Sequence, residues 1–370
     1  MNTPIDQAQA ACQRLEDFVD ADLDETGGGI GWWTTQIGWK HSALLGDYLL
    51  ASIHGISSSL QQADLATRKY RETEYAQNHA LRNEWAKIRA HQGTIDDFVG
   101  AGHNLGPAGT ERELLLTTWN DHAITSMAQT LDRLAAAVLT VAGVRDDILK
   151  TDWGRRNSLA KKTPTSSAQV PRQGTFADPG TPGRELQNTF LSNATSWQDH
   201  GPQDWLPWLL ALRNTNLHRA PLKRWHLMIE ERSQPHGYIV PMPVQPAWAE
   251  TAAMARTSSG SLTDLVIHQP PGDILQGLLG STSSLITSTM TQAGHVWTTR
   301  RTDPGMIVQP GGAWPQIDHA EHLHFPGYGK PANLKVIGGE IRMSPPDTRR
   351  LKAARILQPE LWQNPDNSPS

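Results

Sequence analysis

Apolar residues recur every three or four positions through most of the first 220 residues of the chain. This spacing is that of one face of an α-helix. The predicted helices span residues 5–20, 32–60, 64–91, 111–150, 184–198 and 204–219. The helix over 111–150 is expected to break near Gly143, and a Pro/Gly/Ser-rich stretch over 161–183 is expected to be a flexible loop. The pattern up to residue 220 is therefore typical of a helical bundle.

The pattern changes after residue 221. Short runs rich in β-branched residues lie between prolines and glycines, and such runs favour strands. They are HGYIVPMPV, SLTDLVIHQP, GHVWTTRR, GMIVQP and ANLKVIGGEIRM, with one helix expected over 272–292. The sequence predicts an α+β protein, with a helical bundle over 1–220, a smaller and mainly β module over 221–345, and a polar tail over 346–370.

Composition limits the setting in which the protein works. The 370 residues carry a net charge of −4, so RNA or DNA must be held by a local basic patch. The single cysteine, Cys12, excludes an intramolecular disulfide. No run of about 18 apolar residues and no apolar signal segment is present, so a cytoplasmic protein without a membrane partner is expected.

Three polar residues stand together at the end of the apolar stretch before Pro221. ALRNTNLHRAP, residues 211–221, contains Arg213, Asn214 and His218. RNA is cleaved without a metal when its 2′-hydroxyl attacks the neighbouring phosphorus, which requires an acid–base group and a cation on the phosphate. Histidine supplies the first, and arginine supplies the second through its forked donors. The stretch therefore has the side chains for phosphodiester cleavage.

Helix geometry limits how these side chains meet one ligand. Asn214 and His218 are four residues apart and share a helix face. Arg213 lies roughly 140° from His218 around the axis. It reaches the same ligand through its long side chain, or through a loosened turn at Thr215–Asn216, where an asparagine is a poor interior helix residue.

At these residues the chain resembles the HEPN superfamily of helical "higher eukaryote and prokaryote nucleotide-binding" domains. Its ribonuclease members carry Arg, four to six residues and then His, often with Asn after the Arg, as in Arg213, Asn214 and His218. The resemblance implies a metal-independent endoribonuclease without a cofactor, and a homodimer that brings two motifs together. It also implies a role as a toxin or anti-phage effector, with RNA as substrate and a neutralising or sensor protein as a further partner.

Additional basic residues are candidates for binding RNA phosphates. Arg219 follows His218 directly, and Arg155 and Arg156 belong to the basic run GRRNSLAKK over 154–162. A charged helix end is the usual meaning of such a run. Asp121 and His122, in the predicted helix over 111–150, are expected either to reach the Arg213 cleft or to serve a structural role.

Two other functions remain open. IDHAEHLHFPGYG, residues 317–329, carries His319, His322 and His324, whose imidazoles suit Zn or Fe in a metal-dependent enzyme. The segment lacks the spacing of HExxH. The other possibility is a non-catalytic binding or assembly protein, in which the helical bundle carries a β-rich interaction module. The cationic residues near the end of the 204–219 helix would then interact with its dipole.

Overall fold

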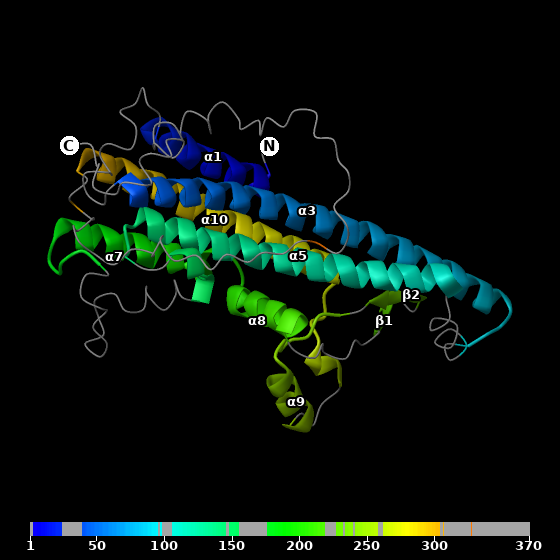
Figure 1. Cartoon of the computed structure of the whole chain (residues 1–370). Coiled ribbons are helices and arrows are strands. Elements are labelled where there is room, and N and C mark those ends of the chain that lie inside the picture. Colours follow the sequence, from blue (N-terminus) through cyan, green and yellow to red (C-terminus); the bar gives the residue numbers. More distant parts are fainter. Residues whose placement is uncertain are drawn as a thin grey trace, which may run out of the picture. The chain divides into compact units, whose positions relative to one another are not determined.

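The structure is a computed structural model and is mainly helical (Figure 1). It describes residues 3–23, 39–94, 97, 106–145, 148–154, 176–218, 227–231, 234–239, 241–257, 262–303, 306 and 327. The α-helices are α1 (Pro4–Leu23), α3 (Trp39–Ala90), α5 (Gly106–Val141), α7 (Pro182–Thr195), α8 (Trp205–His218), α9 (Trp248–Thr257) and α10 (Pro271–Thr302). Short 3-10 helices are η2 (Ile148–Lys150), η3 (Trp197–His200) and η4 (Leu262–Leu265).

The chain divides into two compact units built from interleaved segments. The first comprises Met1–Cys12, His54–Leu134 and Ala194–Met290, and the second comprises Gln13–Ile53, Ala135–Asn193 and Thr291–Ser370. Helices α1, α3, α5, α7 and α10 contribute residues to both units. None of the described helices is long and apolar enough to cross a membrane.

In the first unit, α3 and α5 run side by side in opposite directions (Figure 1). Arg112 near the start of α5 donates to Gln77 at 2.6 Å, whereas Arg133 near its end donates to the carbonyl of Gly55 at 2.7 Å and to Ser59. A Cβ at Gly55 would lie 2.7 Å from Cδ of Arg133. The glycine therefore allows the arginine to lie across α3.

In the second unit, buried side chains donate hydrogen bonds to backbone carbonyls at the C-terminus of α5. Gly143, at φ +63°, donates to Thr140 at 3.1 Å, and Val144 donates to Leu139 at 3.1 Å. This is the Schellman arrangement, in which a left-handed glycine satisfies the last carbonyls of a helix. Arg300 of α10 donates to the carbonyls of Thr140 and Val141 at 2.9 and 2.7 Å. The end of α5 predicted near Gly143 is confirmed.

A second buried side chain also ties α7 to this end of α5. Gln187, which is fully buried, donates to the carbonyl of Ala142 at 2.8 Å and accepts from the backbone N–H of Ala177 at 2.9 Å. Elsewhere in the same unit, Trp297 donates to Asp22 at 2.7 Å, and Arg301 forms an ion pair with Asp22 at 2.9 Å. Polar groups thus hold the apolar helices in register around the core.

The predicted α+β class is wrong, because the region expected to be a β module is mostly helical where it is described. The run GHVWTTRR forms the last turns of α10, and the run SLTDLVIHQP contains η4. One antiparallel ribbon occurs in the described residues, β1 (Leu227–Glu231) with β2 (Gln234–Ile239), and it takes in part of HGYIVPMPV. The runs GMIVQP and ANLKVIGGEIRM lie outside the described residues, apart from Met306.

The physical reason is packing along α10. Its sequence is rich in Gly, Ser, Thr and β-branched residues, which are weak helix formers. Leu275, Leu279, Ile286 and Trp297 are nearly or fully buried, and they recur at helical spacing. The burial of this apolar stripe outweighs the local preference for strands, as tertiary contacts commonly do.

Candidate functional site

Helix α8 carries the predicted Arg–Asn–His stretch and is anchored by its apolar side chains. Trp205, Leu206, Leu209 and Leu212 are buried. The indole of Trp205 donates to the carbonyl of Trp197 at 2.9 Å, and that of Trp208 donates to Pro243 at 3.0 Å. These contacts fix both the depth and the rotation of α8. The helix predicted over 204–219 is confirmed, since α8 spans Trp205–His218.

The last turns of α8 have polar partners on other segments. Thr215, which is buried, donates to the carbonyl of Pro246 at 2.8 Å. Asn216 donates from Nδ2 to Oδ1 of Asp121 on α5 at 2.9 Å. Both side chains that weaken a helix locally are therefore used for tertiary contacts. The backbone stays helical through Thr215 and Asn216, so the loosened turn does not occur.

Arg213 lies against α5 and forms one described ion pair. Its Nη2 is 3.5 Å from Oδ2 of Asp132, with 22% and 26% of the two side chains exposed. The Nε atom of Arg213 is buried and has no hydrogen-bond partner among the described residues. A charge-assisted hydrogen bond between these groups is usually about 2.7–2.9 Å long. Arg213 is thus held by a long contact and not by a two-pronged fork.

Asn214 is exposed, and His218 is the last residue of α8. The structure therefore brings Arg213 and Asn214 onto the final two turns of the helix that ends at His218. The side chain of His218 lies outside the described residues, as do Arg219, Arg155, Arg156, His319, His322 and His324. In the part of the chain that is described, no group of three or more His, Cys, Asp or Glu side chains is placed to hold a metal ion.

Two aspartates of α5, Asp121 and Asp132, contact α8, and the sequence indicated only the first of them as a candidate. Asp121 was expected either to reach this region or to be structural, and it contacts Asn216, while His122 is exposed and lies edge-on to Trp119. Asp132 was not foreseen as a partner of Arg213. The sequence indicates only that Asp132 shares the α5 face of Asp121, because residues 11 apart on a helix fall about 20° from each other; it does not indicate which residue of α8 Asp132 meets.

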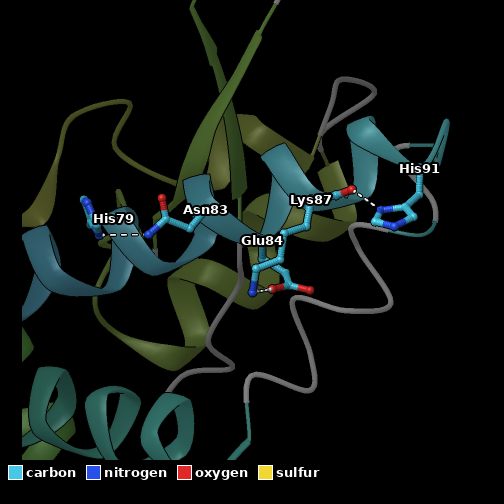
Figure 2. A network of polar contacts seen from close by, with 5 residues as sticks. All are labelled: His79, Asn83, Glu84, Lys87 and His91. Carbon is cyan, nitrogen blue, oxygen red and sulfur yellow. Dashed lines mark hydrogen bonds and ion pairs between the residues drawn. The ribbon is translucent and has the colours of Figure 1, made fainter.

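A separate polar stripe runs along the end of α3 (Figure 2). His79 contacts Asn83 at 3.2 Å, Lys87 pairs with Glu84 at 3.1 Å, and the ring of His91 contacts the carbonyl of Lys87 at 2.8 Å. Four of these residues lie on α3, and His91 directly follows its last residue, Ala90. These are local contacts at helical spacing, typical of a solvated helix face.

Comparisons with protein-family models, with curated proteins and with solved structures find no match. The candidate site consists of the Arg213–His218 stretch of α8 and its contacts with α5.

Proposed function

We propose that the protein is a metal-independent endoribonuclease whose site lies at the C-terminal end of α8. The observation that carries the proposal is the placement of Arg213 and Asn214 on the last turns of one continuous helix that ends at His218. Arg213 is partly exposed and loosely held, so its guanidinium is suited to bind a phosphate. The exposed amide of Asn214 is suited to hydrogen-bond a phosphate oxygen or to orient the imidazole.

The reaction proposed is transphosphorylation. His218 removes the proton from the 2′-hydroxyl of RNA, or gives a proton to the leaving 5′-oxygen. The 2′-oxygen forms a new bond to phosphorus as the bond to the 5′-oxygen breaks, which leaves a 2′,3′-cyclic phosphate. Arg213 stabilises the negative charge that builds up on the phosphate oxygens. The resemblance to HEPN ribonucleases supports a homodimer and a role as a toxin or defence effector.

The test is cleavage of single-stranded RNA by the purified full chain in EDTA. We expect a 2′,3′-cyclic phosphate product. Arg213→Ala and His218→Ala should each lower the rate by about 10² to 10⁴, because each removes a group that acts on the transition state. Arg213→Lys should also fail, since an ammonium lacks the forked donors. Asn214→Ala should have a milder effect.

His226→Ala is the matched control, because His226 is the other histidine that follows an arginine at similar spacing, across Pro221. Loss of cleavage with His226→Ala but not with His218→Ala would place the acid–base group elsewhere. Cleavage that requires added divalent metal would favour the cluster of His319, His322 and His324.

A second candidate is a non-catalytic binding or assembly protein. It is favoured by the Arg213–Asp132 and Asn216–Asp121 contacts, which join α8 to α5 in the manner of structural links. Under this alternative, Arg213→Ala lowers the melting temperature markedly, and the wild-type protein leaves RNA intact. The ribonuclease proposal expects nearly unchanged melting.

A further inference from the structure

Asp132 lies at the position that an anionic ligand of Arg213 would take. Its carboxylate comes from α5, three turns beyond Asp121, and stands 3.5 Å from the guanidinium of Arg213 on α8. A carboxylate and a phosphate present similar oxygens to an arginine fork. A ligand phosphate approaching Arg213 therefore meets a charge of its own sign beside its binding group.

The geometry of the pair indicates that a stronger anion can displace Asp132. The contact is longer than a charge-assisted hydrogen bond, and both side chains are in part exposed. An ion pair of this kind is worth little because solvent screens it. The Nε–H of Arg213 is buried and has no hydrogen-bond partner among the described residues, so the long Nη2 contact to Asp132 does not saturate the donors of the guanidinium.

The neighbouring contact between the same two helices differs in one respect. Asp121 accepts a hydrogen bond of 2.9 Å from Asn216, which is a neutral donor. Asp121 and Asp132 therefore carry the same group on the same helix and face the same partner helix, but only Asp132 is paired with a cation. If Arg213 holds an anion site, substitution of Asp132 should change the affinity for anions, and substitution of Asp121 should not.

We propose that Asp132 is an affinity-determining residue that occupies the anion position of Arg213 until an RNA phosphodiester replaces it. That the displacing anion is an RNA phosphodiester rests on the proposed function. Asp132 lowers the affinity for every anion at Arg213. A polyanionic strand with several contacts overcomes this competition, whereas a single small anion does not.

The experiment measures the binding of a single-stranded RNA whose 2′-hydroxyls are methylated, so that it cannot be cut. The full chain is titrated at low salt in EDTA, with fluorescence anisotropy as the readout. Asp132→Asn should tighten binding by about tenfold, because it removes a competing charge a few ångströms from the phosphate. Asp121→Asn should leave the affinity within about twofold, because it removes no partner of a cation.

A double variant identifies the cation involved. Adding Arg213→Met to Asp132→Asn should abolish the gain and make the salt dependence of binding shallower by about one phosphate contact. A gain that persists without Arg213 overturns the proposal, and so does an equal effect of Asp121→Asn and Asp132→Asn. Loss of helical circular dichroism in Asp132→Asn also overturns it, because the ion pair would then hold α5 and α8 together.

The readout separates this inference from the ribonuclease proposal. If the wild-type protein does not cleave RNA, but Asp132→Asn gains affinity through Arg213, the nuclease is wrong and the anion position stands. If the protein cleaves RNA through Arg213 and His218, but Asp132→Asn binds no tighter, the nuclease stands and Asp132 is a structural partner.

Discussion

Arg300 and Arg213 both link another helix to α5, yet their surroundings are opposite. Arg300 is fully buried and donates to the carbonyls of Thr140 and Val141 at the C-terminus of α5, where the helix dipole favours a cation. Arg213 is 22% exposed and faces a carboxylate on the side of α5 at 3.5 Å. Burial lowers the pKa of Arg300 to about 9, so its guanidinium still carries a charge at neutral pH.

The difference separates an arginine that builds the fold from one that is suited to a ligand. The carbonyls that bind Arg300 belong to the last turn of α5, where the helix itself supplies few N–H donors. The partner of Arg213 is a charged group that water can also solvate. A phosphate can compete for Arg213 without opening the core, whereas no ligand reaches Arg300 without doing so.

Alanine at each arginine should therefore give very different losses of stability. Arg300→Ala is expected to lower the free energy of unfolding by about 3–5 kcal/mol, because it leaves a large cavity and removes the guanidinium that donates to the carbonyls of Thr140 and Val141. Arg213→Ala should cost less than about 1 kcal/mol. Chemical denaturation of both variants measures the two values, and equal losses would remove the distinction between the arginines.

Gln187 offers a neutral version of the same contrast. It is fully buried and bridges Ala177 to Ala142 through both ends of its amide. Gln187→Leu should cost about 2–3 kcal/mol, since it keeps the volume but leaves one donor and one acceptor buried and unpaired. Gln129→Leu, on the exposed side of α5, is the matched control and should be within about 0.5 kcal/mol of the wild type. A small effect at both positions would mean that charge, and not burial, distinguishes Arg300.

The sequence predicted the elements that follow local rules. The apolar spacing of Trp205, Leu209 and Leu212 located α8, and Gly143 marked the end of α5. Helix periodicity and a left-handed glycine are both readable from a few neighbouring residues. Arg213 and Asn214 were instead chosen for the chemistry of their side chains and for the resemblance to the HEPN motif, and their role in a site stays a prediction.

The sequence did not predict contacts that depend on distant segments. Val296 and Thr298–Thr299 favour a strand locally, and only the burial of Val296 and Trp297 makes their segment the end of α10. Asp132 lies 81 positions before Arg213, so nothing close to Arg213 in the sequence indicates their pairing. Such pairs follow from how helices pack, which periodicity alone does not fix.

Glu74 is an intermediate case between the buried and the loosely held charges. It lies on α3, partly buried, and accepts a hydrogen bond from the backbone N–H of Gly272 in the first turn of α10. Asp273 adds a like charge, and Arg71, 3.9 Å from Asp273, adds an opposite one. Burial is the main cause that raises the pKa of Glu74 to about 7, against the hydrogen bond from Gly272, which lowers it. The dipole at the start of α10 also favours a charged carboxylate here, so burial and the helix terminus oppose each other.

Glu74→Gln should reveal which of these effects prevails. The folded protein holds the Glu74 proton up to about pH 7, whereas the unfolded chain releases it near pH 4.5. The free energy of unfolding should therefore fall as the pH rises between these values and stay low above them. A glutamine side chain cannot ionise and keeps an acceptor for Gly272, so the variant should be about 1–2 kcal/mol more stable than the wild type above pH 7, after allowance for solvent screening.

Glu72→Gln, at an exposed residue that pairs with Lys69, should show no such gain. If Glu74→Gln is less stable than the wild type at pH 8, the charged carboxylate stabilises the start of α10, and Glu74 resembles Arg300 in bracing a helix end.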